Sequence, residues 1–174
     1  IGGILLLLTG APGLALLALL AGAACAGFLV WNWAPARIFM GDVGSGFLGF
    51  VFGAAAVASE RAGAVPLLAW VVLLGIFVFD ATVTLVRRVT RGERWYDAHR
   101  SHAYQRAVQA GHSHGRVSGA AAALNLVLGA LAALACLRPT LLLPVLVAAI
   151  LLLALIYRRI ERLRPFPPPP VAGP

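Results

Sequence analysis

Long apolar runs separated by short polar segments dominate the chain. A helix needs about 20 apolar residues to cross the hydrocarbon core of a bilayer. The runs that we read as membrane-spanning helices lie at about 12–31, 44–59, 64–86, 117–137 and 139–157. The run at 44–59 is short, so it spans only if it is shielded or the bilayer is thinner there. The pattern predicts an all-α fold, a polytopic transmembrane helix bundle over residues 1–160.

Both ends of the chain carry further signals. Residues 1–8 form an apolar partial helix that ends at the turn-forming sequence 9–13. Because the chain starts inside this run and without a methionine, we expect it to be a piece of a longer protein that begins within a helix. Four consecutive prolines lie within 161–174, which we read as an extended, proline-rich cytoplasmic tail.

Two polar segments, at about 32–45 and 87–116, interrupt the apolar runs. With the helices threaded as above, these segments and the C-terminus lie on one side of the membrane. That side holds Arg37, the seven arginines within 87–116 and the four within 158–164, which is twelve of the fourteen basic residues. Short loops rich in positive charge stay in the cytoplasm. Both polar loops are therefore predicted to be cytoplasmic.

Composition excludes a water-soluble domain. Hydrophobic residues make up 61% of the chain and charged residues only 11%, whereas soluble domains carry about 25% charged residues. The net charge of +8 would also fit a nucleic-acid-binding protein, but the arginines are interleaved with apolar spans and form no continuous basic face. We therefore expect no nucleic acid partner, and favour anionic lipids or phosphorylated substrates.

The first polar loop contains Asp42, the sole acidic residue among the first 59. Gly41 and Gly44 flank it at the start of an apolar helix, where free backbone N–H groups and the helix dipole favour anions. A carboxylate beside phosphate-binding amides suits Mg²⁺, which takes one or two carboxylates and completes its shell with water and phosphate oxygens. The alternative is that Asp42 simply caps the helix.

The second polar loop concentrates cationic and aromatic residues within 94–106. His99 and His102 share one face if the segment is helical, and Arg100 has the planar fork that binds a diphosphate through two hydrogen bonds. Trp95, Tyr96 and Tyr104 are candidates to stack on a nucleobase. Alternatively, the loop only attracts anionic lipid headgroups. Zinc binding by the histidines is less favoured, because catalytic zinc sites usually recruit a carboxylate or a tighter histidine pattern.

One ionisable residue lies inside an apolar run. Asp80 is placed near the cytoplasmic end of the run at 64–86. Ionisable residues within membrane spans are costly and are candidates for function. A structural ion pair with an arginine such as Arg87 is an equally good explanation, and the sequence leaves both open.

Residues 35–45 and 94–106 together resemble two segments of the polyprenyl-phosphate N-acetylhexosamine-1-phosphate transferases, in the form found in enzymes that initiate O-antigen or related bacterial surface glycans. The resemblance implies that Asp42 is a catalytic Mg²⁺ ligand, with Mn²⁺ as an alternative ion. It implies that Arg37, His99, Arg100 and His102 contact substrate. Further candidates are Asp80, Ser45 and Arg94.

The implied reaction moves a sugar 1-phosphate from a UDP-sugar to polyprenyl phosphate and releases UMP, on the cytoplasmic face of a bacterial inner membrane. The family's paired aspartates are missing from this chain, so we expect the segment alone to be inactive. A transporter or channel, or a structural membrane subunit with a lipid-binding basic loop, remains the alternative. The sugar, the polyprenol length and any oligomerisation stay open.

Overall fold

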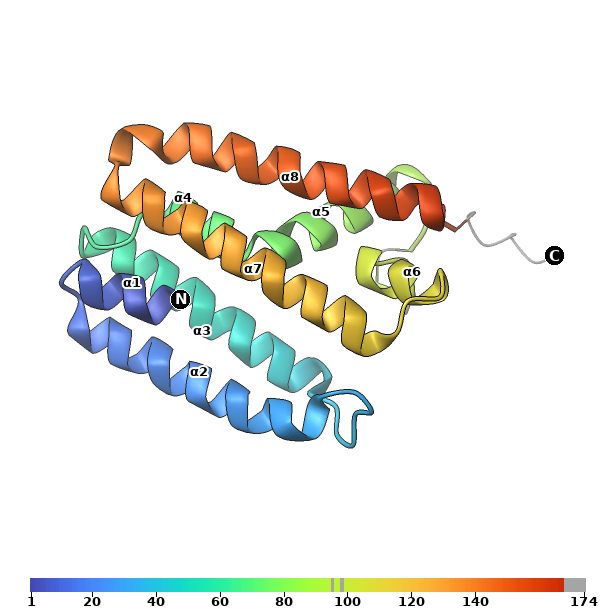
Figure 1. Ribbon diagram of the computed structural model, residues 1–174, viewed down its shortest axis with the longest axis horizontal. Helices are drawn as coiled ribbons and strands as arrows, with labels where there is room; N and C mark the ends of the chain where they lie inside the picture. Colours follow the sequence, from blue (N-terminus) through green and yellow to red (C-terminus); the bar gives the residue numbers. More distant parts are fainter. Residues whose placement is uncertain (95, 98, 168–174) are drawn as a thin grey trace.

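The chain folds into a bundle of long helices (Figure 1). The computed structural model describes residues 1–94, 96–97 and 99–167. Its α-helices are α1 (Gly2–Leu8), α2 (Pro12–Asn32), α3 (Gly41–Arg61), α4 (Leu67–Leu73), α5 (Gly75–Thr90), α6 (Ala103–Gln109), α7 (His114–Leu137) and α8 (Leu142–Leu163), with a 3₁₀ turn, η1 (Pro139–Leu141), before α8. The predicted all-α class is confirmed, and the described residues contain no strand. Of the predicted tail, residues 161–163 belong to α8 and 168–174 lie outside the described residues.

Four segments of the described chain are long and apolar enough to cross a bilayer, namely α2, α3, α7 and the stretch Pro139–Leu163. They coincide with four of the predicted spans. The prediction that the second span is short is wrong, because α3 starts at Gly41 and has 21 residues. At about 1.5 Å per residue, it reaches about 31 Å and needs no thinning of the bilayer. The sequence reading had placed the polar residues 41–43 before the helix, whereas they form its first turn.

The predicted span at 64–86 is broken, which corrects the single helix expected there. Helices α4 and α5 meet at an angle of 81°, and Leu74 between them leaves helical geometry at φ −92° and ψ 9°. Gly75 sits so close to the neighbouring helices that a Cβ atom there would lie 3.2 Å from Leu153 and 3.3 Å from Leu128. The bend leaves an apolar cavity of about 210 Å³ between α4, α5 and α8.

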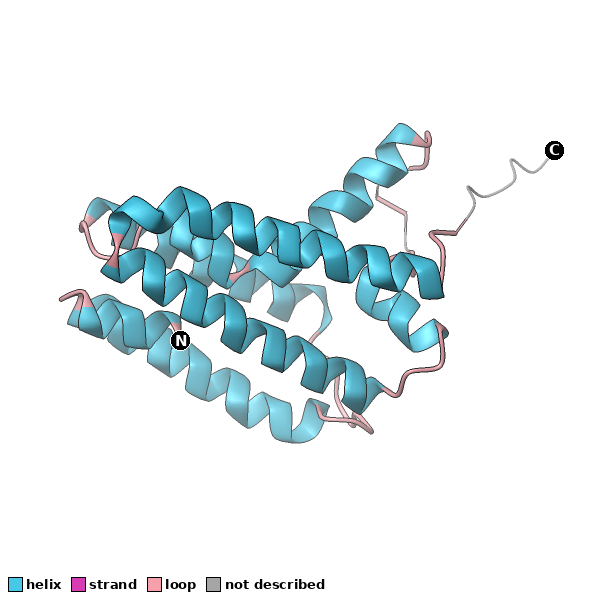
Figure 2. Ribbon diagram, turned by 45° about the horizontal axis from the view of Figure 1, so that its top comes forward, coloured by secondary structure: helices cyan, strands magenta, loops and turns pink. Residues whose placement is uncertain are grey.

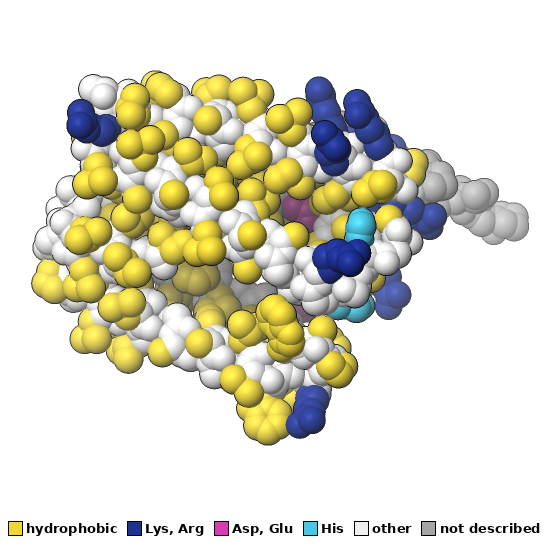
Figure 3. Space-filling model, viewed as in Figure 1, with side chains coloured by type: hydrophobic (Ala, Val, Ile, Leu, Met, Phe, Trp, Pro, Cys, Tyr) yellow, Lys and Arg dark blue, Asp and Glu magenta, His cyan; other side chains and the backbone are white. Residues whose placement is uncertain are grey.

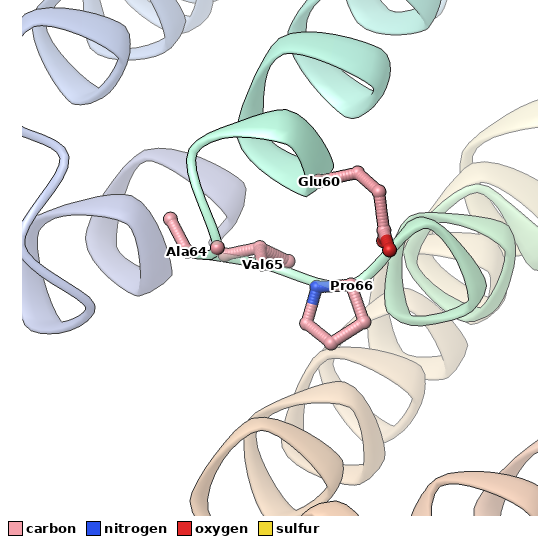
Figure 4. Close-up of a pocket in the computed structure, with 5 residues that line it drawn as sticks. Glu60, Ala64, Val65 and Pro66 are labelled. Atoms are coloured by element: carbon pink, nitrogen blue, oxygen red, sulfur yellow. The ribbon is translucent and has the colours of Figure 1, made fainter.

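The turn between α3 and α4 is held by polar contacts at one end of the bundle. The buried Trp70 indole donates to Ser59 Oγ at 2.7 Å, and that hydroxyl lies 3.0 Å from the Val65 carbonyl oxygen. The Glu60 carboxylate accepts from the Leu67 N–H, which caps the start of α4. A cavity of about 100 Å³ opens beside this turn (Figure 4). These polar groups are engaged in fixing the turn, so we assign no chemistry to the cavity.

The opposite end of the bundle gathers the polar segments. The α2–α3 loop, the segment that holds α6 and the C-terminal end of α8 all lie there, and a second view shows α8 ending beside α6 (Figures 1 and 2). Dark blue arginine side chains gather mainly at the same end on the visible face (Figure 3). The fold therefore brings together the segments that carry the twelve arginines.

The side of the membrane on which this end lies can be tested with introduced cysteines. In full-length protein without its native Cys25 and Cys136, we expect Arg162→Cys to be shielded from an impermeant thiol reagent in intact cells, and Thr140→Cys to react. Both positions are exposed and lie at opposite ends of α8 and η1. Permeabilised cells provide the control, since both cysteines should then react. Labelling of Arg162→Cys in intact cells would reverse the predicted orientation.

Candidate functional site

Asp42 lies in the first turn of α3 with an exposed side chain. Gly41 adopts φ +67°, which favours glycine, and a Cβ atom on Gly44 would come within 2.5 Å of Met40 Cγ. The N-cap residue is Met40 and no side chain caps the helix, so the alternative that Asp42 is the cap is wrong. The Ser45 hydroxyl donates to the backbone carbonyl of Asp42 at 3.2 Å. This hydrogen bond leaves the Asp42 carboxylate free.

The rest of the first loop closes on itself. The Arg37 N–H donates to the Trp31 carbonyl oxygen at 2.9 Å, and the Asn32 side chain donates to the Ile38 carbonyl oxygen at 2.8 Å. The Arg37 guanidinium lies 6.0 Å from the centre of the Trp31 ring. Arg37 and Trp31 are both exposed at this end of the bundle. The loop thus presents a cation and a free carboxylate beyond the apolar part of α2 and α3.

The two histidines of the second loop are close, but for a different reason than predicted. They do not share a helix face, because His102 is extended at φ −59° and ψ 150° and α6 begins after it. Their ring centres are nevertheless 4.9 Å apart. Ser101, which is buried, lies with its hydroxyl 2.8 Å from His99 Nδ1, and the Tyr104 ring stacks on His102 with 5.9 Å between ring centres.

His99 is held in its neutral form at neutral pH. Its pKa is lowered from the usual 6.5, first by burial and then by the positive charge of Arg88 and by His102. Burial disfavours the charged imidazolium, and a nearby cation acts in the same direction. A neutral imidazole offers hydrogen bonds but carries no positive charge. The cationic part of this loop is therefore supplied by its arginines.

Asp80 joins the membrane helix α5 to the histidine loop. Its Oδ2 lies 3.2 Å from His102 Nδ1, and its Oδ1 accepts from the Ala103 N–H at 2.9 Å and from the Thr84 hydroxyl at 3.3 Å. The predicted alternative of an ion pair with Arg87 is wrong, because that arginine pairs with another acid. Asp80 thus fixes both a histidine side chain and the start of α6.

Arg88 organises the segment between α5 and the histidines, a role that sequence reasoning missed. Only 3% of Arg88 is exposed. Its guanidinium pairs with Glu93 at 3.0 Å and donates to the backbone carbonyls of Arg94 at 2.6 Å and Asp97 at 3.2 Å. The Arg94 side chain itself is exposed. The sequence pattern does not distinguish Arg88 from other arginines at the end of a helix.

A second missed cluster docks α6 onto α8. Arg106 is fully buried, and its Nη1 lies 2.9 Å from Glu161 Oε2, which also receives Arg87 Nη1 at 2.6 Å. The Arg106 guanidinium lies 4.8 Å from the centre of the Tyr157 ring and 5.5 Å from that of Phe166. One signal was available, because Glu161 is the sole acidic residue after position 97, set among four arginines.

The candidate residues form two groups at the same end of the bundle. One group is centred on His102, which contacts both Asp80 and His99. No hydrogen bond or ion pair between described residues links this group to the first loop. Arg100 is exposed, with its carbonyl held by the Gln109 side chain at 3.1 Å. Trp95, a candidate to stack on a base, lies outside the described residues. Within the described chain, no three His, Cys, Asp or Glu side chains are grouped to hold a metal.

These features define an integral membrane protein whose candidate site residues gather at one end of an apolar helix bundle. The family described as Glycosyl transferase family 4 matches residues 1–60, which include the Asp42 segment. This match covers 60 of the 174 residues, and it agrees with the resemblance of residues 35–45 to the polyprenyl-phosphate N-acetylhexosamine-1-phosphate transferases. No solved structure matches the chain significantly.

Curated relatives agree with this assignment. A decaprenyl-phosphate N-acetylglucosaminephosphotransferase of Mycobacterium tuberculosis is 33% identical over 109 residues, covering 54% of this chain and 26% of that protein. A probable undecaprenyl-phosphate N-acetylglucosaminyl 1-phosphate transferase of Bacillus subtilis is 32% identical over 90 residues, covering 51% and 25%. A phospho-N-acetylmuramoyl-pentapeptide-transferase of a Mycobacterium species is 47% identical over 74 residues, covering 42% and 19%. The chain spans about a quarter of the length of these relatives.

Proposed function

We propose that the protein transfers an N-acetylhexosamine 1-phosphate from a UDP-sugar to polyprenyl phosphate and releases UMP. The observation that carries this proposal is the gathering of the Asp42 loop and the His99–His102 pair at one end of a membrane bundle whose first 60 residues match the transferase family. We place that end at the cytoplasmic face of a bacterial inner membrane. There a soluble nucleotide sugar reaches a phosphate carried by a lipid.

The described residues have the chemistry to hold the donor. Arg100 is exposed beside the histidines and offers a planar fork for two phosphate oxygens. Neutral His99 and the adjacent His102 add hydrogen-bonding nitrogens that substrate can reach. Phosphoryl transfer depends mainly on positioning and on charge stabilisation. We propose that the second loop positions the donor and stabilises its charge, without forming a covalent intermediate.

We propose Asp42 as one ligand of Mg²⁺, with Mn²⁺ as the alternative ion. Its carboxylate is exposed and has no partner among the described side chains. One carboxylate is not a complete metal site, so the described residues alone do not fit the ion, and water, phosphate oxygens or other acidic groups would have to complete it. We therefore assign no catalytic step to a metal.

The alternative of a purely lipid-binding basic loop makes a different prediction for Arg100. If Arg100 holds the donor diphosphate, Arg100→Lys should lower kcat/KM for the UDP-sugar about tenfold, because lysine keeps the charge and loses the fork. If the loop only attracts headgroups, lysine should substitute freely. The measurement is steady-state kinetics of full-length enzyme with saturating lipid substrate.

The matched control is Arg116→Lys, an exposed arginine in the first turn of α7, which begins after the loop that holds His99 and His102. It should leave the donor kinetics unchanged. His99→Ala and His102→Ala should each lose about tenfold as well. Unchanged donor kinetics in all three site variants would remove the second loop from the donor site and leave the headgroup hypothesis standing.

A further inference from the structure

His102 has one ring nitrogen already engaged. Its Nδ1 lies 3.2 Å from Asp80 Oδ2, and Nε2 has no hydrogen-bond partner among the described residues. An ionised carboxylate is purely an acceptor, so the nitrogen that faces it must carry a proton. In neutral His102 the second nitrogen then bears the lone pair. The geometry points to one tautomer of His102.

Several contacts fix the carboxylate that makes this selection. The other oxygen of Asp80 accepts hydrogen bonds from the Ala103 N–H at 2.9 Å and from the Thr84 hydroxyl at 3.3 Å. The Asp80 side chain is only 15% exposed, and Thr84 is buried. Asp80 belongs to a membrane helix, whereas His102 lies 22 positions later in the loop. The Thr84 contact therefore anchors the carboxylate from α5 itself, independently of the loop that it orders.

The His102 ring is also confined from its sides. The His99 ring centre lies 4.9 Å away at a tilt of 38°, and the Tyr104 ring is nearly parallel to His102 at 18°. The His102 backbone N–H donates to the Gln105 side chain at 3.2 Å, which fixes the turn into α6. With its planes flanked and Nδ1 facing Asp80 Oδ2, the His102 side chain is still 28% exposed. The remaining reactive atom is Nε2.

We propose that Asp80 is a positioning residue that holds His102 with its proton on Nδ1 and thereby reserves Nε2 for substrate. The role of Nε2 toward substrate rests on the proposed transferase function, whereas the arrangement of Asp80 and His102 does not depend on it. When the His102 ring is neutral, Nε2 has a free lone pair and can accept a proton or a hydrogen bond from a substrate group. When the ring is protonated, the Nε2–H group can donate a hydrogen bond to a phosphate oxygen. The orienting bond of a histidine decides which of its nitrogens does this.

The variant Asp80→Asn tests the effect of Asp80 on His102 separately from its contacts with Ala103 and Thr84. The amide oxygen can still accept from Ala103 and Thr84, so the start of α6 keeps its contacts. The amide nitrogen is a donor, so it favours a lone pair on His102 Nδ1 and moves the proton to Nε2. We expect kcat/KM to fall roughly 10- to 100-fold, as is typical when an orienting partner of a functional histidine is lost.

Two measurements test the proposal on full-length protein in detergent. The first is ¹⁵N NMR of labelled histidines above pH 7.5, with the His102 signals assigned from the His102→Ala spectrum. Wild type should show a protonated Nδ1, and Asp80→Asn should show a protonated Nε2. The second is kinetics, in which Asp80→Asn should cause no further loss once His102 is alanine, since residues that act as a unit are not additive.

Thr84→Val is the matched control, because it removes a contact to the other oxygen of Asp80 and leaves the bond to His102. It should retain the wild-type tautomer and lose less than about threefold in kcat/KM. A wild-type His102 that is protonated on Nε2 would overturn the proposal, as would full activity of Asp80→Asn. Absence of transferase activity in wild type would instead refute the proposed function, while the NMR result would still decide the Asp80–His102 arrangement.

Discussion

Replacing Asp42 by asparagine in the full-length enzyme should lower turnover by at least about a hundredfold, the scale typical of losing one group that stabilises charge in a transition state. The change keeps the size of the side chain and removes its negative charge. The Asp42 carboxylate is exposed and contacts no other described side chain. The expected loss therefore cannot come from a broken contact within the described chain.

The measurement is transferase activity across a titration of Mg²⁺. Val43→Ala is the matched control, since Val43 lies beside Asp42 in the first turn of α3 and its side chain is exposed. It should retain most of the activity. If Asp42→Asn turns over at the wild-type rate at every Mg²⁺ concentration, Asp42 is neither a metal ligand nor a catalytic residue.

The largest effect on stability is expected for Glu161→Gln. Arg106 is fully buried, and Glu161 is the acid that pairs with it and with Arg87. Removing one partner of a buried pair leaves an uncompensated charge and costs about 3 to 5 kcal/mol. Because the Glu161 side chain is 29% exposed, we expect a value near 3 kcal/mol, at the lower end of that range.

This prediction is checked by the midpoint of thermal unfolding in detergent, which should fall by several degrees. Arg162→Ala provides the control, since Arg162 is exposed on the same helix, and its free energy of unfolding should change by less than about 0.5 kcal/mol. Equal midpoints for Glu161→Gln and wild type would show that the Arg106 charge is compensated in another way.

The long helices could be predicted because each leaves a local signature in the chain. An uninterrupted apolar run is enough to define α2, α7 and α8. The bend before Gly75 left no such signature, since residues 67–79 on both sides of it are apolar and contain no proline. At the bend, Gly75 packs closely against Leu128 and Leu153, which are far away in the sequence.

The candidate site was predictable in its residue types but not in its connections. His99 and His102 could be selected because they crowd into four positions. Whether they lie on a helix could not be decided from the sequence, because the start of α6 depends on Asp80, which accepts the Ala103 N–H from another helix. Arg106 and Glu161 were missed because they are 55 positions apart, and periodicity reports only neighbours along the chain.

The C-terminal end of α8 has a practical consequence for handling the protein. Phe166 is buried against the guanidinium groups of Arg87, Arg91 and Arg106, and Arg91 donates to the Pro167 carbonyl oxygen at 2.6 Å. A reporter or purification tag joined at Leu163 would replace residues 164–167, which make these contacts, with foreign sequence. The disturbance would pass through Arg106 to α6, so fusions should begin after Pro167.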